Sequence, residues 1–249
     1  KKRNLKENLK NLKPGIIINC SAFTDVELSE VKKTEARIIN ADALKIISKY
    51  CINNDTTLIH FSTDYVFNSK FKKLFKEDSY TNPINYYGKT KLLGEKYIKK
   101  YMNKFYIFRV SWLYSKSQNN FYTKIKKKIL NKNLKKINVV NDQFGCPLST
   151  EYVSNIISNN LIDIKNAKLP FGIYNISTKN YTSWYLFAKY INYKLKLKNK
   201  IFKIKTSALN LKAKRPKYSI LKFSYFRKLV KRKKTWQELF DDYIVKYKL

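Results

Sequence analysis

The 249-residue sequence is poor in glycine and proline, with five of each, and it has three cysteines and one histidine. Cys20, Cys51 and Cys146 lie far apart and form no CxxC pair, so we expect free thiols in a reducing compartment and no disulfide framework or zinc site. His60 lies two residues before the end of a predicted strand region, where we interpret it as a packed or capping side chain. With one histidine, we expect no Ser-His-Asp or Cys-His mechanism within this chain.

Long apolar runs are also absent. The most apolar stretch, around 16–18, is far shorter than the ~20 residues of a membrane-spanning helix. The basic start of the sequence is not followed by the apolar segment of a signal peptide. We expect a cytoplasmic protein with no membrane partner.

Negative charge is scarce: 17 acidic residues face 53 basic ones, for a formal net charge of +36. Such an excess indicates nucleic acid or an anionic membrane surface as a partner. However, only six basic residues are arginine, the better residue for bidentate phosphate contacts, and the lysines are spread along the chain. The abundant residue types have AT-rich codons, so codon bias explains the charge without a partner. We expect no nucleic-acid partner, although the charge favours acidic ligands such as nucleotide phosphates.

Apolar periodicity predicts strands that alternate with helices, which is typical of an α/β fold with a parallel sheet covered on both faces. Leu5, Leu9 and Leu12 predict an amphipathic first helix. The further predicted helices cover residues 29–53, 86–102, 118–131 and 150–162, and the predicted strands cover residues 16–20, 57–61, 105–110 and 137–140.

Two domains are expected from this pattern. Residues 1–165 are predicted to form a Rossmann-like, doubly wound domain. Residues 166–249, with shorter strands and fewer helices, are predicted to form a smaller α+β substrate-binding lobe. Part of 112–130 is expected to contribute to that lobe. Ligands of such sheets bind beyond the carboxyl ends of the strands. The polar residues that end the predicted strands, at 19–24, 62–64 and 111–112, are therefore the candidate site.

Tyr87 and Lys91 form a YxxxK pattern at the start of a predicted helix. Positions four apart lie on one helical face, so the phenol and the ammonium can reach one pocket. A nearby cation lowers the pKa of a phenol, which would let Tyr87 exchange a proton near neutral pH. A third hydroxyl, that of Thr63, is expected from a neighbouring strand end. The pattern alone is weak evidence, because an ordinary helix face with a solvated lysine gives the same spacing.

The surrounding motifs make the pattern specific. STDYVF (62–67) ends a strand about 20 residues before YGKTK (87–91), and this pairing resembles the extended short-chain dehydrogenase/reductase family. The closest resemblance is to the dTDP-4-dehydrorhamnose reductases and covers nearly the whole chain. It is carried further by the segments INCSAFTDVE (18–27), NPINYYGKTKLLGE (82–95), FRVSWLY (108–114), NDQFGCPLST (141–150), YNISTKNYTSWYLFA (174–188) and AKRPKYSIL (213–221).

The resemblance implies a role for individual residues. Tyr87 would donate a proton, Lys91 would hold the nicotinamide ribose, and Thr63, in place of the usual serine, would hydrogen-bond the sugar oxygen. Asp64, Trp112 and Arg215 would join Thr63 in contacting the substrate, with Gln143 and Gly145 in motifs on the same side. The implied cofactor-binding residues are Ala22, Phe23, Thr24, Phe61, Tyr87 and Lys91.

One family feature is missing. Members of the family begin with a strand, a glycine-rich turn and a helix that bind the cofactor diphosphate. The glycines here, Gly15, Gly88, Gly94, Gly145 and Gly172, form no such turn. The first βαβ unit is thus absent, which leaves three explanations: a fragment, a late annotated start, or a protein that has lost cofactor binding. We expect this exact chain to bind NADPH weakly or not at all.

The resemblance implies reduction of the C4 ketone of dTDP-4-dehydro-6-deoxy-L-mannose to dTDP-L-rhamnose, with NADPH or NADH as the cofactor. It leaves open a homodimer, with Mg²⁺ at its interface. The alternatives are a non-catalytic regulatory or binding member of the family, and a related nucleotide-sugar reductase or epimerase.

Overall fold

A four-stranded parallel sheet in the order β1-β2-β4-β9 forms the centre of the computed structural model. Its strands are β1 (Ile16–Asn19), β2 (Thr57–Thr63), β4 (Phe105–Val110) and β9 (Gly172–Asn175). The structure describes residues 2–117, 119–131, 133–134, 136–197, 199–223, 230 and 232–248. The parallel sheet confirms the predicted fold class, and β9 joins this sheet although it lies after the predicted boundary at residue 165.

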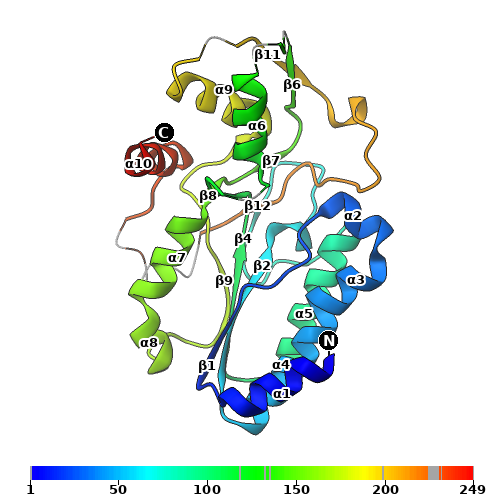
Figure 1. The fold of residues 1–249 in the computed structure, drawn as a ribbon, viewed down its shortest axis with the longest axis vertical. Helices are drawn as coiled ribbons and strands as arrows, with labels where there is room; N and C mark the ends of the chain where they lie inside the picture. Colours follow the sequence, from blue (N-terminus) through cyan, green and yellow to red (C-terminus); the bar gives the residue numbers. More distant parts are fainter. Residues whose placement is uncertain are drawn as a thin grey trace.

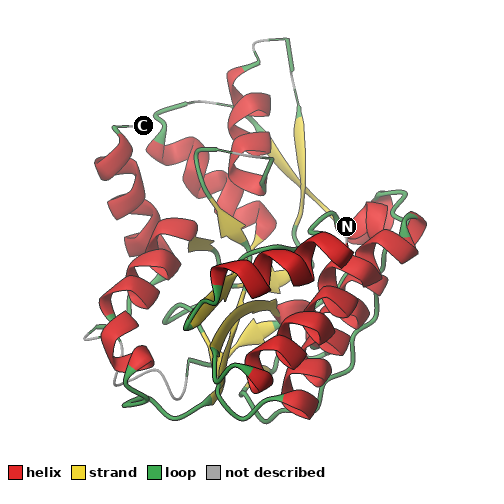
Figure 2. Cartoon of the chain, turned by 60° about the horizontal axis from the view of Figure 1, so that its bottom comes forward, coloured by secondary structure: helices red, strands yellow, loops and turns green. Residues whose placement is uncertain are grey.

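Helices cover both faces of the sheet (Figures 1 and 2). On one face, Leu58 and Ile107 pack with residues of α1 (Lys2–Leu12), α4 (Ala43–Asn53) and α5 (Tyr86–Tyr101). Side chains alternate along a strand, so Ile59, Tyr106 and Phe108 point to the opposite face. There they pack with residues of α7 (Thr150–Asn159) and α8 (Leu161–Lys165). This is the doubly wound arrangement that the alternating pattern predicted.

The long helix predicted over residues 29–53 is divided into shorter pieces. They are α2 (Val26–Val31), α3 (Lys33–Arg37), a π-helical turn over Ile38–Asp42, and α4. Asn40 and Ala41 of the π turn are buried against α5. Gly94 of α5 allows this contact, because a Cβ atom there would lie 2.3 Å from the main-chain oxygen of Asn40.

The smaller lobe contains α6 (Phe121–Leu130), α9 (Trp184–Lys194) and α10 (Trp236–Tyr247), beside a two-stranded sheet (Figure 1). That sheet pairs β6 (Ile137–Val140) in parallel with β11 (Ile201–Ile204). The expectation that residues 137–140 belong to the central sheet is therefore wrong, because an apolar strand pattern does not specify its pairing partner. The core of the lobe is largely aromatic and includes Tyr114, Tyr122, Phe187, Trp236, Phe240 and Tyr243.

Pairs of very short strands complete the fold. Strand β3 (Leu74–Phe75) pairs with β12 (Ile220–Leu221), β5 (Leu113–Tyr114) with β8 (Leu148–Ser149), and β7 (Phe144–Gly145) with β10 (Thr182–Ser183). The first two pairs hold segments that follow β2 and β4 of the central sheet against segments from the second half of the chain. Among the described residues, no helix has the length and apolar character needed to cross a membrane.

Candidate active site

A cavity of about 360 Å³ lies at the carboxyl ends of the central strands. Five of the predicted site residues line it: Thr24, Thr63, Asp64, Tyr87 and Trp112. They come from the segments after β1, β2 and β4 and from the start of α5, so the fold brings together residues up to 88 positions apart in sequence. These five side chains therefore lie around one cavity, and their roles in a site stay a prediction.

Tyr87 owes its position to the first turn of α5. Asn85 caps the helix, its side chain accepting a hydrogen bond of 2.8 Å from the Gly88 main-chain nitrogen. Gly88 packs directly against the turn after β2, since a Cβ atom there would lie 2.3 Å from the main-chain oxygen of Tyr65. This close approach brings the Tyr87 ring edge-on to Tyr65 and its hydroxyl to the hydroxyl of Thr63.

The pKa of Tyr87 differs in direction from the sequence-based expectation. Burial raises it to about 12, and the hydrogen bond with Thr63 opposes this rise only in part. The expected lowering is thus wrong for this structure, because the loss of water around the phenol outweighs the stabilisation of the phenolate. Near neutral pH Tyr87 is protonated, which is the form that a proton donor requires.

Lys91 lies one helical turn after Tyr87 and is buried, with 2% of its surface exposed. Its Nζ atom donates a hydrogen bond of 2.6 Å to the Phe61 carbonyl oxygen and lies 3.2 Å from Nε2 of His60. Burial lowers the pKa of Lys91 to about 8, while the charge of Glu95 opposes that change. Phe61 thus enters the site through its main chain, with its carbonyl holding the lysine.

Asp64 is buried and engaged by the hydroxyls of Ser219, Thr63 and Ser111. Ser219 donates to its Oδ2 atom at 2.5 Å, and Thr63 donates to its Oδ1 atom at 3.2 Å. Burial nevertheless raises its pKa to about 6. Since Ser219 directly precedes β12, this carboxyl group joins the end of β2 to the C-terminal part of the chain. Its predicted contact with substrate stays a prediction.

Trp112 forms one wall of the cavity by stacking on Trp184, with ring centroids 3.4 Å apart and planes 6° apart. Gly145 makes room for the indole, because a Cβ atom there would lie 2.4 Å from its Cε2 atom. Gln143 accepts a hydrogen bond of 3.2 Å from Nε1 of Trp184. Trp184 was not selected from the sequence, where only its place in the YNISTKNYTSWYLFA segment pointed to it.

Arg215 lies beside this cavity rather than in it. It lines an adjacent hollow of about 660 Å³, which shares Phe121 and Trp184 with the first. Its Nη2 atom lies 2.8 Å from Oε1 of Glu27, a partner that the sequence did not reveal. A substrate long enough to pass Trp184 could reach both hollows, so the predicted contact with Arg215 stays a prediction.

The predicted cofactor residues Ala22, Phe23 and Thr24 follow β1. The main chain of Phe23 is held by Asn40, whose Oδ1 accepts from the Phe23 nitrogen at 2.8 Å and whose Nδ2 donates to the Phe23 oxygen at 3.1 Å. Asn40 also donates to the Thr90 hydroxyl at 3.1 Å, which ties this loop to α5. These contacts identify Asn40 as the residue that positions the loop.

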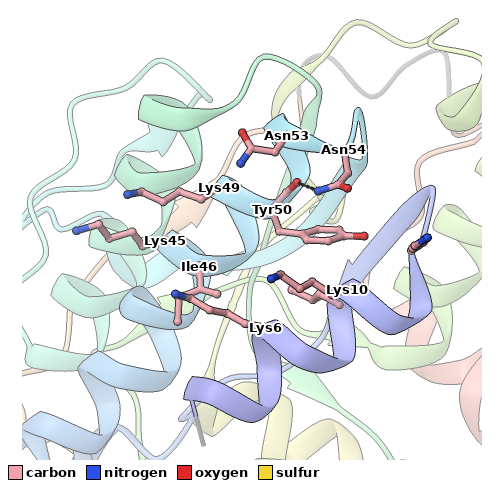
Figure 3. A pocket seen from close by; sticks show the side chains of 10 residues that line it. Lys6, Lys10, Lys45, Ile46, Lys49, Tyr50, Asn53 and Asn54 are labelled. Atoms are coloured by element: carbon pink, nitrogen blue, oxygen red, sulfur yellow. Dashed lines mark hydrogen bonds between the residues drawn. The ribbon is translucent and has the colours of Figure 1, made fainter.

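A larger hollow, of about 680 Å³, lies between α1 and the C-terminal half of α4 (Figure 3). Its lining contains no acidic residue and five lysines: Lys6, Lys10, Lys13, Lys45 and Lys49. It includes none of the predicted site residues. The absence of a nucleic-acid partner stays a prediction. In the described part of the chain no cluster of three His, Cys, Asp or Glu side chains could hold a metal ion, so the Mg²⁺ prediction has no support there.

Comparison with known proteins identifies the family. Residues 1–249 match the protein family described as the RmlD substrate binding domain. The chain is 32% identical over 227 residues to a dTDP-4-dehydrorhamnose reductase of Escherichia coli K12, which covers 89% of this chain and 75% of that protein. The chain belongs to the dTDP-4-dehydrorhamnose reductase family. The resemblance seen in the sequence motifs is thereby confirmed.

Solved structures of family members have the same fold. A dTDP-4-dehydrorhamnose reductase of Bacillus anthracis, in complex with NADP, superposes with a TM-score of 0.90 at 30% identity, covering 99% of this chain and 85% of that one. A Clostridium acetobutylicum reductase gives 0.89 at 32% identity, covering 100% and 86%. The fold, and membership of an NAD(P)H-dependent oxidoreductase family, are thus established for this chain.

The residues of this chain suit the nicotinamide ribose of a nicotinamide dinucleotide better than its diphosphate. Tyr87 and Lys91 provide a phenol and a buried amino group at the strand ends, which suits a nicotinamide ribose. No glycine-rich turn is present to receive the diphosphate. Strand β1 pairs with β2 alone among the described residues.

Proposed function

We propose that this protein reduces the C4 ketone of dTDP-4-dehydro-6-deoxy-L-mannose to the alcohol, giving dTDP-L-rhamnose, with NADPH or NADH as the reductant. Membership of the reductase family supports the reaction. The observation that carries the residue roles is the meeting of Thr63 and Tyr87 in the cavity at the end of β2. Lys91 follows one helical turn after Tyr87, bonded to the Phe61 carbonyl. Names of the E. coli and B. anthracis relatives support the substrate and the NADP cofactor, respectively.

Tyr87 is the proposed acid. Its hydroxyl proton passes to the C4 oxygen, and the bound nicotinamide supplies the hydride that goes to C4. Thr63 donates a hydrogen bond to the same sugar oxygen and holds it beside the phenol. The raised pKa of Tyr87 keeps the phenol protonated until the oxygen becomes basic. We propose that Lys91, one helical turn further along α5, stabilises the phenolate that is left.

The substrate is proposed to lie between the two hollows. The stacked Trp112 and Trp184 rings offer a flat apolar surface for the sugar or base, and Arg215 offers a guanidinium to the diphosphate. The partner is therefore the dTDP-sugar. A homodimer in the cytoplasm, without nucleic acid, is part of the same proposal.

The test is NADPH oxidation at saturating cofactor with and without the keto-sugar. We expect oxidation only when the keto-sugar is present, and a loss of about 10²–10⁴-fold in Tyr87→Phe, the range of general acid catalysis. Tyr86→Phe is the matched control, because it removes the neighbouring hydroxyl, and it should keep the rate. A Tyr87→Phe protein with the wild-type rate would refute the proposed acid.

A non-catalytic role within the family is the second candidate, and the formal net charge of +36, which suits an acidic binding partner, is the observation that favours it. A binding subunit would co-purify with a stable partner and show no turnover at any NADPH concentration. Turnover that depends on Tyr87 would exclude this role.

A further inference from the structure

The loop that precedes β12 is fixed to the opposite half of the molecule by two side chains. Glu27 of α2 accepts a hydrogen bond of 2.9 Å at Oε2 from the Lys212 main-chain nitrogen, and its Oε1 atom lies 2.8 Å from Nη2 of Arg215. Asn85 donates from Nδ2 to the Lys214 carbonyl oxygen at 2.9 Å. In Figure 1 this loop is the orange chain beside α2. Two elements from the first half of the chain therefore hold the loop in place.

Both anchors of the loop belong to the framework around Tyr87. Asn85 is the residue that caps α5. Helix α2, which carries Glu27, is tied to the first turn of α5, because Glu30 accepts a hydrogen bond of 2.7 Å from the Tyr86 main-chain nitrogen. The position of the loop before β12 is therefore linked to the helical turn that carries the proposed acid.

The guanidinium of Arg215 has one terminal nitrogen beside Glu27 and a second that is differently placed. The side chain is 14% exposed, and its Nη1 atom is buried with no hydrogen-bond partner in the described part of the chain. Because a guanidinium is planar and its donors point in fixed directions, an acceptor beside Nη2 determines where Nη1 points. A buried donor without an acceptor is unfavourable in a fold, so this edge of the guanidinium favours a ligand that supplies one.

The hollow of about 660 Å³ that Arg215 lines is suited to an anion. The described residues of its lining include no acidic side chain, and α6 contributes three lysines to it, Lys124, Lys127 and Lys128. Glu27 is not part of this lining, so its carboxylate contacts the guanidinium from outside the hollow. A guanidinium is well matched to a diphosphate, because its parallel donors fit pairs of phosphate oxygens.

We propose that Glu27 is a positioning residue for substrate binding: it holds the Arg215 guanidinium so that its second edge faces the diphosphate of the nucleotide sugar in this hollow. The inference rests on the proposed function, which supplies that diphosphate. The same carboxylate holds the Lys212 main chain, so one side chain fixes both the loop and the guanidinium. Because α2 is tied to the first turn of α5, the diphosphate is held in a fixed position relative to Tyr87.

Binding of dTDP and of thymidine, measured by calorimetry without cofactor or keto-sugar, tests this role. Arg215→Met should weaken dTDP binding about 10–100-fold, the range for loss of a charged hydrogen bond, and should leave thymidine binding unchanged. Glu27→Gln should weaken dTDP binding about tenfold, although it makes the protein more positive. Attraction between charges alone predicts the opposite, tighter binding. An affinity for dTDP in Glu27→Gln that equals or exceeds that of the wild type would therefore overturn the proposal.

Glu27→Gln is the informative change because it keeps one side-chain oxygen for the Lys212 main-chain nitrogen. Its matched control is Glu35→Gln on α3, which makes the same change of charge on a side chain that is 57% exposed and lies 3.5 Å from Lys32. The control should leave the affinity for dTDP unchanged. An equal loss of affinity in both variants would show that the place of Glu27 beside Arg215 does not matter.

Exchange of the two partners separates a contact with ligand from a purely structural ion pair. Glu27→Arg alone places two guanidinium groups side by side and should lower the urea midpoint of unfolding. The double variant Glu27→Arg with Arg215→Glu restores an ion pair, so it should recover part of that loss. It should not recover dTDP binding, because the carboxylate then lines the hollow. A double variant with the wild-type affinity for dTDP would contradict the proposal, since the pair would then serve only to join the loop to α2.

The binding measurements do not depend on turnover, which separates this inference from the proposed function. Tyr87→Phe should remove NADPH oxidation and keep the affinity for dTDP. In active protein, Glu27→Gln should raise KM for the keto-sugar more than it lowers kcat. Wild-type protein that binds dTDP no more tightly than thymidine would overturn the inference, while the reduction would still be decided by the rate of Tyr87→Phe.

Discussion

The indoles of Trp112 and Trp184 stack face to face, 3.4 Å apart, across the boundary between the two parts of the fold. Trp112 follows β4 of the central sheet and has a left-handed backbone, with φ of 47°, while Trp184 opens α9 of the smaller lobe. A left-handed tryptophan is uncommon and persists only where the surroundings hold it. The stack, with Gly145 beneath it, is what orients this wall of the cavity.

Gly145→Ala is predicted to displace the stack. The added methyl group would lie 2.4–2.9 Å from three atoms of the Trp112 indole, so the ring must move. Because displacement of a positioning group by about 1 Å can cost on the order of 10²-fold, we expect kcat/KM for the keto-sugar to fall by that order. Tryptophan fluorescence should change in parallel. Gly15→Ala is the control, since its methyl group would meet no atom within 4 Å, and an unchanged kcat/KM in Gly145→Ala would refute the role of the wall.

Because of Asp64, the free energy of unfolding is predicted to fall as pH rises through the acidic range. Its pKa is about 6 in the fold against an ordinary 3.8, so the folded state holds this proton more tightly than the unfolded chain does. The stabilising contribution is complete below pH 3.8 and is lost as pH passes 6. We expect Asp64→Asn to remove roughly 3 kcal/mol of this dependence, measured by urea unfolding at several pH values. Asp78→Asn, on an exposed loop, should leave the dependence intact; identical profiles for Asp64→Asn and wild type would contradict the assignment.

Removing only one partner of the buried pair of Glu95 and Arg109 is predicted to lower the free energy of unfolding strongly. Glu95 also accepts a hydrogen bond of 2.5 Å from Ser62, and Arg109 donates one of 2.9 Å to the Glu77 carbonyl. Glu95→Ala leaves a buried guanidinium without its carboxylate, which should cost about 3–5 kcal/mol in urea unfolding. The double variant Glu95→Leu with Arg109→Met should recover much of that loss. A double variant less stable than Glu95→Ala would show that the pair is needed for more than charge compensation.

The elements of the central sheet could be predicted from the sequence because their signals are local. Apolar runs such as Ile16–Asn19 and Phe105–Val110 are bounded by polar residues, and parallel strands buried on both faces read as continuous apolar segments. Pairing is not local, so the strand at Ile137–Val140 was placed in the wrong sheet. The π turn at Ile38–Asp42 could not be predicted either, since its close contact with α5 depends on Gly94, a residue of another helix.

Site residues could likewise be predicted from the sequence where their signals are local. Thr63, Tyr87 and Trp112 end strands or begin a helix, and their motifs carried a family resemblance. Trp184 and Glu27 could not be selected, because their roles depend on side chains more than 70 residues away. The pKa of Tyr87 is raised and not lowered as expected, because the YxxxK spacing indicates a neighbouring cation but not how deeply the phenol is buried.

Residues 1–249 are predicted to bind NADPH little better than reduced nicotinamide mononucleotide. The residues that suit the nicotinamide end, Tyr87 and Lys91, are present, whereas no glycine-rich turn offers main-chain N–H groups to the diphosphate. Without that anchor, the adenosine half should add less than about tenfold in affinity, or about 1.4 kcal/mol. Calorimetric titration of both ligands measures the ratio. Lys91→Met should weaken the binding of both ligands alike if their shared nicotinamide half provides the affinity. If NADPH instead binds about a thousandfold tighter than the mononucleotide, another part of this chain holds the diphosphate.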